Sequence, residues 1–171
     1  MQEYLVVDGY NVIYAWPDLA RHKLSDIEHA RYSLISILAD YSSLCGQKVV
    51  VVFDAHQQKN HTCNVECIDG VDVIYTRSGE TADTLIERLS GELLCRGEVY
   101  VVTSDWAEQV IVFGRGAYRM TPGELRTRIE EVAREVKDVW QGTGLLDGYL
   151  ENRLNDEATR LKLECWRREK G

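Results

Sequence analysis

Four aspartates stand at positions where a folded chain would bring carboxylates together. Asp8, Asp54 and Asp105 stand just past short runs rich in valine, and Asp83 opens an amphipathic segment. Such β-branched runs, separated by helical segments, are typical of buried parallel strands. An open parallel sheet binds its ligand at the carboxyl ends of its strands. The pattern therefore predicts that the four carboxylates converge on one cleft.

Carboxylates held a few ångströms apart repel one another unless a hard divalent cation neutralises them. Mg²⁺ and Mn²⁺ prefer oxygen ligands, so we expect one of these ions as the cofactor of a phosphoryl-transfer site. The structural alternative is that acids cap strand ends and helix N-termini, where negative charge is favourable. That alternative explains any single aspartate more easily than the coincidence of all four.

The elements that would position these acids can be traced along the chain. Ser25 and Glu28 form a capping box before a helix that Gly46 stops, and Thr81 is the expected N-cap of a helix that Gly97 stops. Residues 121–124 predict a further helix, to about Trp140, which begins with a capping box and a proline. Other expected elements are strands over 5–7, 48–54, 71–76 and 98–105, a connection over 10–23, a surface loop over 55–67, a short helix from 106 and a last amphipathic helix after 144.

Composition limits the class of protein. The 171 residues, 44% of them hydrophobic, suffice for one compact core, and no apolar stretch approaches the ~20 residues that span a bilayer. We therefore expect no membrane association. The odd number of cysteines fits a reducing compartment better than a disulfide framework, which predicts a cytoplasmic protein. These are Cys45, Cys63, Cys67, Cys95 and Cys165.

A formal charge of −8 argues against a protein that holds nucleic acid mainly by a large positive field. A local cluster of basic residues can still steer a phosphate backbone. We expect such an RNA-binding cluster at Arg115, Arg119, Arg126 and Arg128, with a solvated charged face as the alternative. Tyr10 and Trp16 lie near Asp8 in sequence and could stack unpaired bases, and core packing is the alternative for both.

Several competing sites fit the residues less well. His56, His61, Cys63 and Cys67 share one segment, but their spacing is unlike a zinc site. A haloacid-dehalogenase-type phosphatase would carry a second aspartate two residues after Asp8, where Tyr10 stands. A dinucleotide-binding domain would carry a Gly-x-Gly-x-x-Gly turn after the first strand, and the sequence after Asp8 does not contain this pattern.

Five blocks of the chain, in this order, resemble the NYN-domain branch of the PIN-like nucleases, and specifically the small bacterial YacP-type proteins. The blocks are Val7-Asp8-Gly9-Tyr10-Asn11, Val52-Phe53-Asp54-Ala55-His56, Gly79-Glu80-Thr81-Ala82-Asp83 with Glu87, Thr103-Ser104-Asp105 with Glu108-Gln109, and Gly116-Ala117 before Glu124-Leu125. The resemblance implies a three-layer α/β/α fold with a central, mostly parallel sheet. It also implies a metal-dependent endoribonuclease, associated in this branch with translation-linked decay of mRNA.

The resemblance places Asp8, Asp83 and Asp105 in the metal cleft, with Asp54 at its rim and Asn11 beside Asp8. On this basis we assign the first three as ligands of Mg²⁺ or Mn²⁺. The outer residues would be Asp54 or Glu87 orienting water, Asn11 positioning a phosphate, and Ser104 or Thr103 donating to a phosphate oxygen. For Ser104 and Thr103 a structural hydrogen bond is an equal alternative.

The predicted organisation is a nuclease domain over 1–141 and a helical extension over 142–171, packed on the domain or contacting a partner. We expect single-stranded RNA, in particular mRNA, as substrate, the ribosome as a possible partner, and no DNA substrate. The competing function is a non-catalytic RNA- or ribosome-binding adaptor with the same fold. An adaptor has no physical need to crowd carboxylates into a cleft meant for phosphate.

Overall fold

The computed structural model describes residues 1–21, 26–54, 65–77, 79–105, 109, 111 and 113–143. The chain divides into two compact units, Met1–Val132 and Ala133–Gly171. The described part of the second unit is the end of helix α6. No helix among the described residues is long and apolar enough to cross a bilayer.

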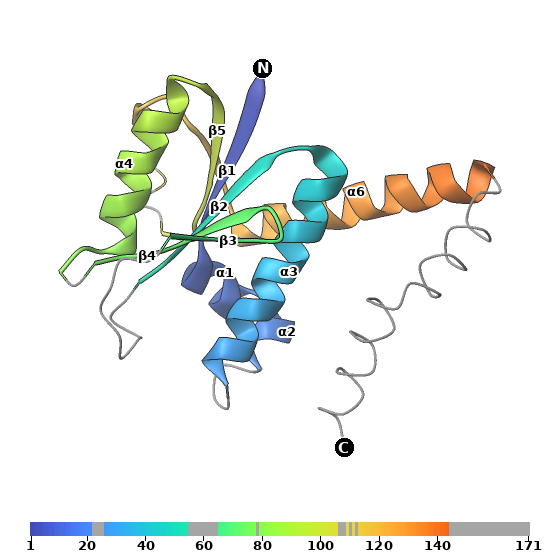
Figure 1. Cartoon of the computed structure of the whole chain (residues 1–171), viewed down its shortest axis with the longest axis horizontal. Helices are drawn as coiled ribbons and strands as arrows, with labels where there is room; N and C mark the ends of the chain where they lie inside the picture. The colour runs from blue at the N-terminus through green and yellow to red at the C-terminus, as the bar shows by residue number, and fades with distance from the viewer. Residues whose placement is uncertain are drawn as a thin grey trace. The chain divides into compact units, whose positions relative to one another are not determined.

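The first unit is built on a six-stranded sheet with the order β3-β4-β2-β1-β5-β6 (Figure 1). The strands are β1 (Gln2–Asp8), β2 (Lys48–Phe53), β3 (Val65–Ile68), β4 (Val71–Tyr75), β5 (Gly97–Val102) and β6 (Tyr118–Met120). Every pairing is parallel except that of β3 with β4. The predicted, mostly parallel sheet is therefore confirmed.

Strand β1 lies at the centre of the sheet, and its register decides what meets at the carboxyl edge. Val7 pairs with Val51 of β2 on one side and with Val102 of β5 on the other. The three strands consequently end at nearly the same level. Asp8 and the residues that follow Phe53 and Val102 therefore emerge at one edge of the sheet.

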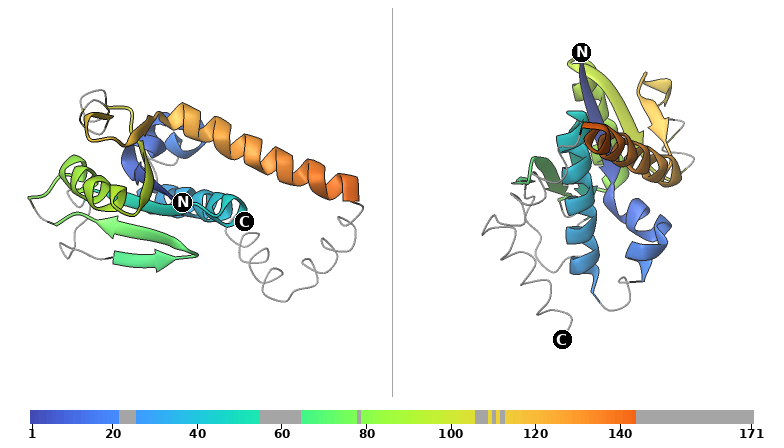
Figure 2. Two further views of the ribbon diagram at one scale, coloured as in Figure 1. Left: turned by 90° about the horizontal axis from the view of Figure 1, so that it is seen from above. Right: turned by 90° about the vertical axis from the view of Figure 1, so that its right-hand side faces the viewer.

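Helices cover both faces of the sheet (Figure 2). They are α1 (Gly9–Ala15), α2 (Pro17–Ala20), α3 (Ile27–Cys45), α4 (Ala82–Leu94) and α6 (Pro122–Thr143). On one face, Leu85 and Ile86 of α4 pack in a cluster with Val6. On the other, Leu34 of α3 and Leu125 of α6 belong to a larger cluster. This arrangement confirms the expected three layers.

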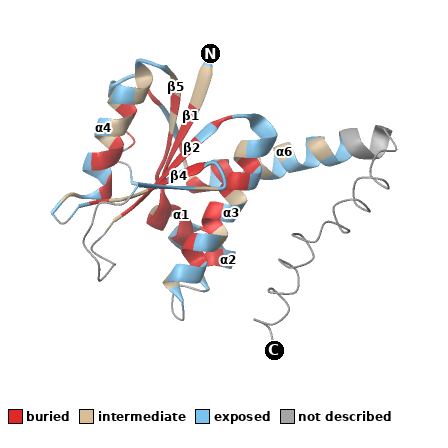
Figure 3. Cartoon of the chain, in the orientation of Figure 1, coloured by how far each residue is buried: buried red, intermediate tan, exposed pale blue. Residues whose placement is uncertain are grey.

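The buried residues follow the same division, with the central strands buried almost throughout and α4 exposed on its outer side (Figure 3). Burial of Val and Leu on both faces of the central strands β1, β2 and β5 explains why these strands appear as continuous apolar runs in the sequence. The sheet is thus a rigid support for whatever lies at its carboxyl edge.

Capping residues set the ends of the helices. Thr81 caps α4 as predicted, with its hydroxyl accepting the backbone N–H of Thr84 at 3.3 Å. Thr121 and Glu124 form the predicted reciprocal capping box at the start of α6. Helix α3 is capped by Asp26, which accepts the backbone N–H groups of Glu28 and His29. The predicted cap Ser25 lies outside the described residues.

The structure corrects several predictions of local structure and adds a strand that was not predicted. The expected connection over 10–23 contains helices α1 and α2, because Asp8 caps α1 and Pro17 occupies the first position of α2. The expected loop over 55–67 contains the start of β3, and residues 55–64 lie outside the description. Strand β6, at the edge of the sheet, was not predicted at all.

Gly97 does not stop α4, which ends before Cys95, but is the first residue of β5. A Cβ atom there would lie 1.9 Å from the carbonyl oxygen of Gln2 in β1, so the close pairing of the two strands requires glycine. Helix α6 extends beyond the predicted end, to Thr143. Most of the predicted helix from 106, and residues 144–171 with the predicted last helix, lie outside the description.

Candidate active site

The turn from β1 into α1 fixes the first candidate ligand. Asp8 is buried, and Asn11 donates to both of its carboxylate oxygens, from the backbone N–H at 3.1 Å and from the side-chain amide at 2.7 Å. Gly9 permits this turn, since a Cβ atom there would lie 2.2 Å from the ring of Phe53. Asp8 is therefore an N-cap, as the structural alternative proposed, and it is also held rigidly at the carboxyl edge.

Asp8 and Asp83 lie close enough to other aspartates at this edge for the pKa of each to be affected. Burial raises the pKa of Asp8, the hydrogen bonds from Asn11 oppose this shift, and the charges of Asp83 and Asp54 add to it. Burial also raises the pKa of Asp83, and the charges of Asp105 and Asp54 raise it further. The fold thus gathers the four predicted acids into one electrostatically coupled group, from three strand ends and the first turn of α4.

The segment after β5 joins this group through Asn11. The Ser104 hydroxyl donates to the side-chain oxygen of Asn11, so the amide that holds Asp8 is itself held by Ser104. Thr103 is fully buried, and its hydroxyl accepts the backbone N–H of Asp105 at 3.1 Å. Both residues therefore have structural hydrogen bonds within the site, which was the alternative to phosphate contact.

Gln109 stands in the fourth of the five blocks quoted from the sequence, but it was not predicted as a site residue. Its side chain is buried and donates to the Thr103 carbonyl at 2.6 Å, while its oxygen accepts from Arg119 at 3.1 Å. Its backbone N–H also donates to the carbonyl of Asp105 at 3.0 Å. Gln109 therefore ties together the strand end that carries Asp105 and the edge strand β6.

The donors at this edge fit a hard cation in their chemistry, since they are carboxylates, and burial and like charge raise the pKa of Asp8 and of Asp83. No group of three or more His, Cys, Asp or Glu side chains among the described residues is spaced as a preformed metal cluster.

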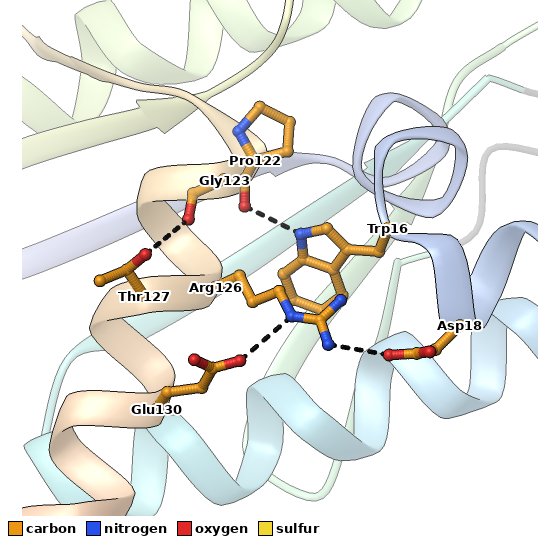
Figure 4. A network of polar contacts seen from close by, with 7 residues as sticks. All are labelled: Trp16, Asp18, Pro122, Gly123, Arg126, Thr127 and Glu130. Carbon is orange, nitrogen blue, oxygen red and sulfur yellow. Dashed lines mark hydrogen bonds and ion pairs between the residues drawn. The ribbon is translucent and has the colours of Figure 1, made fainter.

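Glu87, predicted as an outer residue of the cleft, forms an ion pair with Arg115. The four arginines predicted as one cluster are in fact engaged by different neighbours. Arg119 contacts Gln109, and Arg128 lies 3.6 Å from Glu3. Arg126 contacts Asp18 at 2.8 Å and Glu130 at 3.1 Å (Figure 4). Arg119 and Arg128 line one surface hollow, whereas Arg115 and Arg126 do not line it. The role of the four arginines in RNA binding stays a prediction.

The two aromatic side chains proposed to stack bases are each only 5% exposed, which favours core packing. The indole N–H of Trp16 donates to the carbonyl of Pro122 at 2.8 Å and so joins the end of α1 to the start of α6 (Figure 4). Tyr10 packs edge-on against Phe53 at 5.2 Å and accepts from Arg31 at 3.2 Å. Neither ring offers a free face to a base.

Arg31 was also missed by sequence reasoning. It is buried in α3, where it donates to the hydroxyl of Tyr10 and lies over the ring of Tyr75 at 5.8 Å. A buried arginine in the middle of an amphipathic helix gives no distinct sequence signal. Its contacts support the layer of aromatic rings beneath the turn that carries Asp8.

A mostly parallel sheet between two layers of helices, with aspartates at its carboxyl edge, is typical of a PIN-like α/β/α domain of the nuclease type. The family model described as the YacP-like NYN domain matches residues 5–168, and the chain belongs to this family. It is 41% identical to the protein YacP of Bacillus subtilis over 141 residues, which cover 78% of each chain.

Solved structures support the same assignment. The chain is similar to the crystal structure of Rae1 (YacP) from Bacillus subtilis, with a TM-score of 0.73 and 37% identity over 96% of this chain and 94% of that one. A crystal structure of a point mutant of Rae1 gives a TM-score of 0.68 and 39% identity over 82% of both chains. These matches confirm the resemblance and the fold predicted from the sequence.

Proposed function

We propose that this protein is a Mg²⁺- or Mn²⁺-dependent endoribonuclease that hydrolyses phosphodiester bonds in single-stranded RNA. The observation that carries the proposal is the coupled group of Asp8, Asp54, Asp83 and Asp105 at one edge of the sheet. Burial and like charge raise the pKa of Asp8 and of Asp83, which disfavours their charged forms in the fold, and a bound cation would remove that cost. Membership of an NYN family supports the assignment to RNA chemistry.

The side chains have distinct parts in this proposal. Asp8, Asp83 and Asp105 would hold the ion, which would supply positive charge against the non-bridging oxygens and would activate a water. Asn11 keeps the Asp8 carboxylate in one orientation, and Ser104 keeps Asn11 in place. Asp54, half-buried at the end of β2, accepts a proton or orders water at the rim. In the hydrolysis itself, water oxygen bonds to phosphorus as the bond to the leaving oxygen breaks, and the leaving oxygen takes up a proton.

We further propose mRNA as the substrate and the ribosome as the place of action in the cytoplasm, on the strength of the likeness to YacP-type proteins. The free thiols Cys45, Cys67 and Cys95 accord with a reducing compartment. A substrate bound to a ribosome would be presented as single strand, which suits an open cleft at a sheet edge.

Cleavage of a labelled single-stranded RNA tests the proposal. The protein is incubated with the RNA in Mg²⁺, Mn²⁺ or EDTA, and the product ends are mapped, with a DNA of the same sequence in parallel. We expect internal cuts in RNA alone, which require metal and disappear in folded Asp83→Asn. This substitution keeps the shape of the side chain and removes its charge. The same reactions with mRNA bound to ribosomes show whether the ribosome is needed.

Two outcomes would contradict the enzyme. Near-normal turnover by folded Asp83→Asn at saturating metal would remove Asp83 from the site. Tight RNA or ribosome binding without metal-dependent cuts, on free or ribosome-bound RNA, would favour the adaptor.

A further inference from the structure

A surface hollow of about 620 Å³ lies where β4 leads into α4. Its lining combines two guanidinium groups with two hydroxyls and one carboxylate. The lining residues are Arg77, Gly79, Glu80, Thr81, Thr84 and Arg88. None of them belongs to the acid group, and all of them precede or occupy the first two turns of α4.

The hollow carries a net positive charge in an otherwise acidic protein. Arg88 pairs with Glu80 at 2.7 Å, which leaves Arg77 as the surplus cation. Arg77 is exposed and makes no ion pair with any described residue. Arg115, Arg126 and Arg128, in contrast, are each paired with a carboxylate. Of the two arginines that line the hollow, Arg77 is therefore the better placed to accept a new anionic partner.

The chemistry of the lining suits a phosphodiester. A guanidinium presents parallel N–H donors that match two phosphate oxygens, and hydroxyl groups add further donors. Thr81 and Thr84 supply such hydroxyls, 2.9 Å apart. Glu80 opposes an anion directly, but its pairing with Arg88 neutralises part of that repulsion.

The elements that form the hollow also carry the candidate aspartates or lie beside the strands that do. Asp83 lies in the same helical turn as Thr81 and Thr84, so the hollow and the candidate ligand share the start of α4. Strand β4, which ends just before Arg77, is the direct neighbour of β2, after which Asp54 follows. A strand of RNA whose scissile phosphate lies at the acids would therefore place a neighbouring phosphate beside Arg77.

We propose that Arg77 and Arg88 form a phosphate subsite for single-stranded RNA next to the cleavage position. The inference rests on the proposed function, since it names how that same site holds its substrate. The subsite binds the backbone and not the bases, so its contribution is independent of RNA sequence. Glu80 tunes it by engaging Arg88 when RNA is absent.

Equilibrium binding of a fluorescent oligouridylate tests the subsite separately from cleavage. Binding is measured in EDTA at several salt concentrations for the wild type and for Arg77→Gln, Arg88→Gln and Glu80→Gln. The matched control is Arg96→Gln, which removes the same charge from an exposed position just beyond the C-terminal end of α4. Thermal melts show that each variant is folded, and cleavage with metal is measured in parallel.

Each lost phosphate contact should flatten the plot of log affinity against log salt by about 0.7. When salt is raised from about 50 to 200 mM, the affinity of Arg77→Gln and of Arg88→Gln for RNA should each fall by a factor about 2.6 times smaller than the affinity of the wild type does. Glu80→Gln should bind more tightly, because it removes a negative charge and releases Arg88. Arg96→Gln should keep the wild-type slope.

Unchanged slopes in Arg77→Gln and Arg88→Gln would overturn the subsite, and so would an equal change in Arg96→Gln. Absence of measurable RNA binding by the wild type would also overturn it, whether or not the protein cleaves RNA. Flattened slopes without any metal-dependent cleavage would support the subsite and contradict the nuclease. The two proposals can therefore fail separately.

Discussion

Substitution of Gln109 by Leu should separate the positioning of the acids from their chemistry. Gln109 contributes no charge to the cleft, yet its amide holds the Thr103 carbonyl at 2.6 Å and its oxygen accepts from Arg119. Leucine fills a similar volume but offers neither contact. The variant thus leaves a buried carbonyl without its side-chain donor, two residues before Asp105.

The magnitude follows from that lost donor. A buried acceptor left unsatisfied costs about 1–3 kcal/mol. For a domain of this size that corresponds to a fall in Tm of about 2–12 °C. If Asp105 shifts by an ångström as a result, the rate of the chemical step falls by up to about 10²-fold. KM should change little, because Gln109 is buried and does not face the RNA.

The matched control is Gln47→Leu. Gln47 is equally buried, accepts from the hydroxyl of Tyr41 at 3.0 Å and donates to Glu3 at 3.1 Å, but it precedes β2 at the opposite end of the sheet. Melting curves and kcat for metal-dependent RNA cleavage are measured for both variants. We expect comparable losses of stability and a loss of kcat in Gln109→Leu alone. If kcat falls equally in both, or in neither, Gln109 serves the fold and does not position Asp105.

Two further predictions concern stability. Trp16→Phe should lower the free energy of unfolding by about 1–3 kcal/mol, because the buried Pro122 carbonyl loses its donor, and RNA affinity should stay constant. A loss of affinity without a loss of stability would instead show that Trp16 contacts RNA. For Asp8 and Asp83 the folded-state pKa is raised, so the folded protein binds protons more tightly than the unfolded chain. Stability in EDTA should therefore fall as pH rises from about 3.9 through the raised values, and urea titrations should show a flatter fall in Asp8→Asn than in the exposed control Asp40→Asn.

The helices and strands that were predicted correctly are those whose structure depends on residues close together in the sequence. The valine runs of β2 and β5 are buried on both faces, and the caps Thr81 and Thr121 act on residues three positions away. Strand β3 escaped prediction because it is exposed along most of its length and so lacks an apolar pattern. Strand β6 has three residues, too few to show a period.

The residues of the candidate site also fall into two groups, those that could be predicted from the sequence near them and those whose partners lie far along the chain. Strand-end positions sufficed to group the four aspartates, because parallel strands that share a register deliver their next residues to one edge. The partners of Arg115 and Arg126 could not be foreseen, since Glu87 and Asp18 come from distant parts of the chain. Burial of Trp16 likewise depends on Pro122, which lies far along the sequence.

The central place of β1 has a consequence for the order in which the site is made. During synthesis β1 receives its second neighbour only when β5 has been made, since Gln2 pairs with Gly97. Until then β1 has an open edge, and Asp105 has not yet joined Asp8. Domains fold as their chains emerge, and distant parallel pairings form late. A nascent chain that ends before Asp105 therefore has no complete acid group, so under the proposed function the emerging polypeptide would not cleave RNA while it is still short.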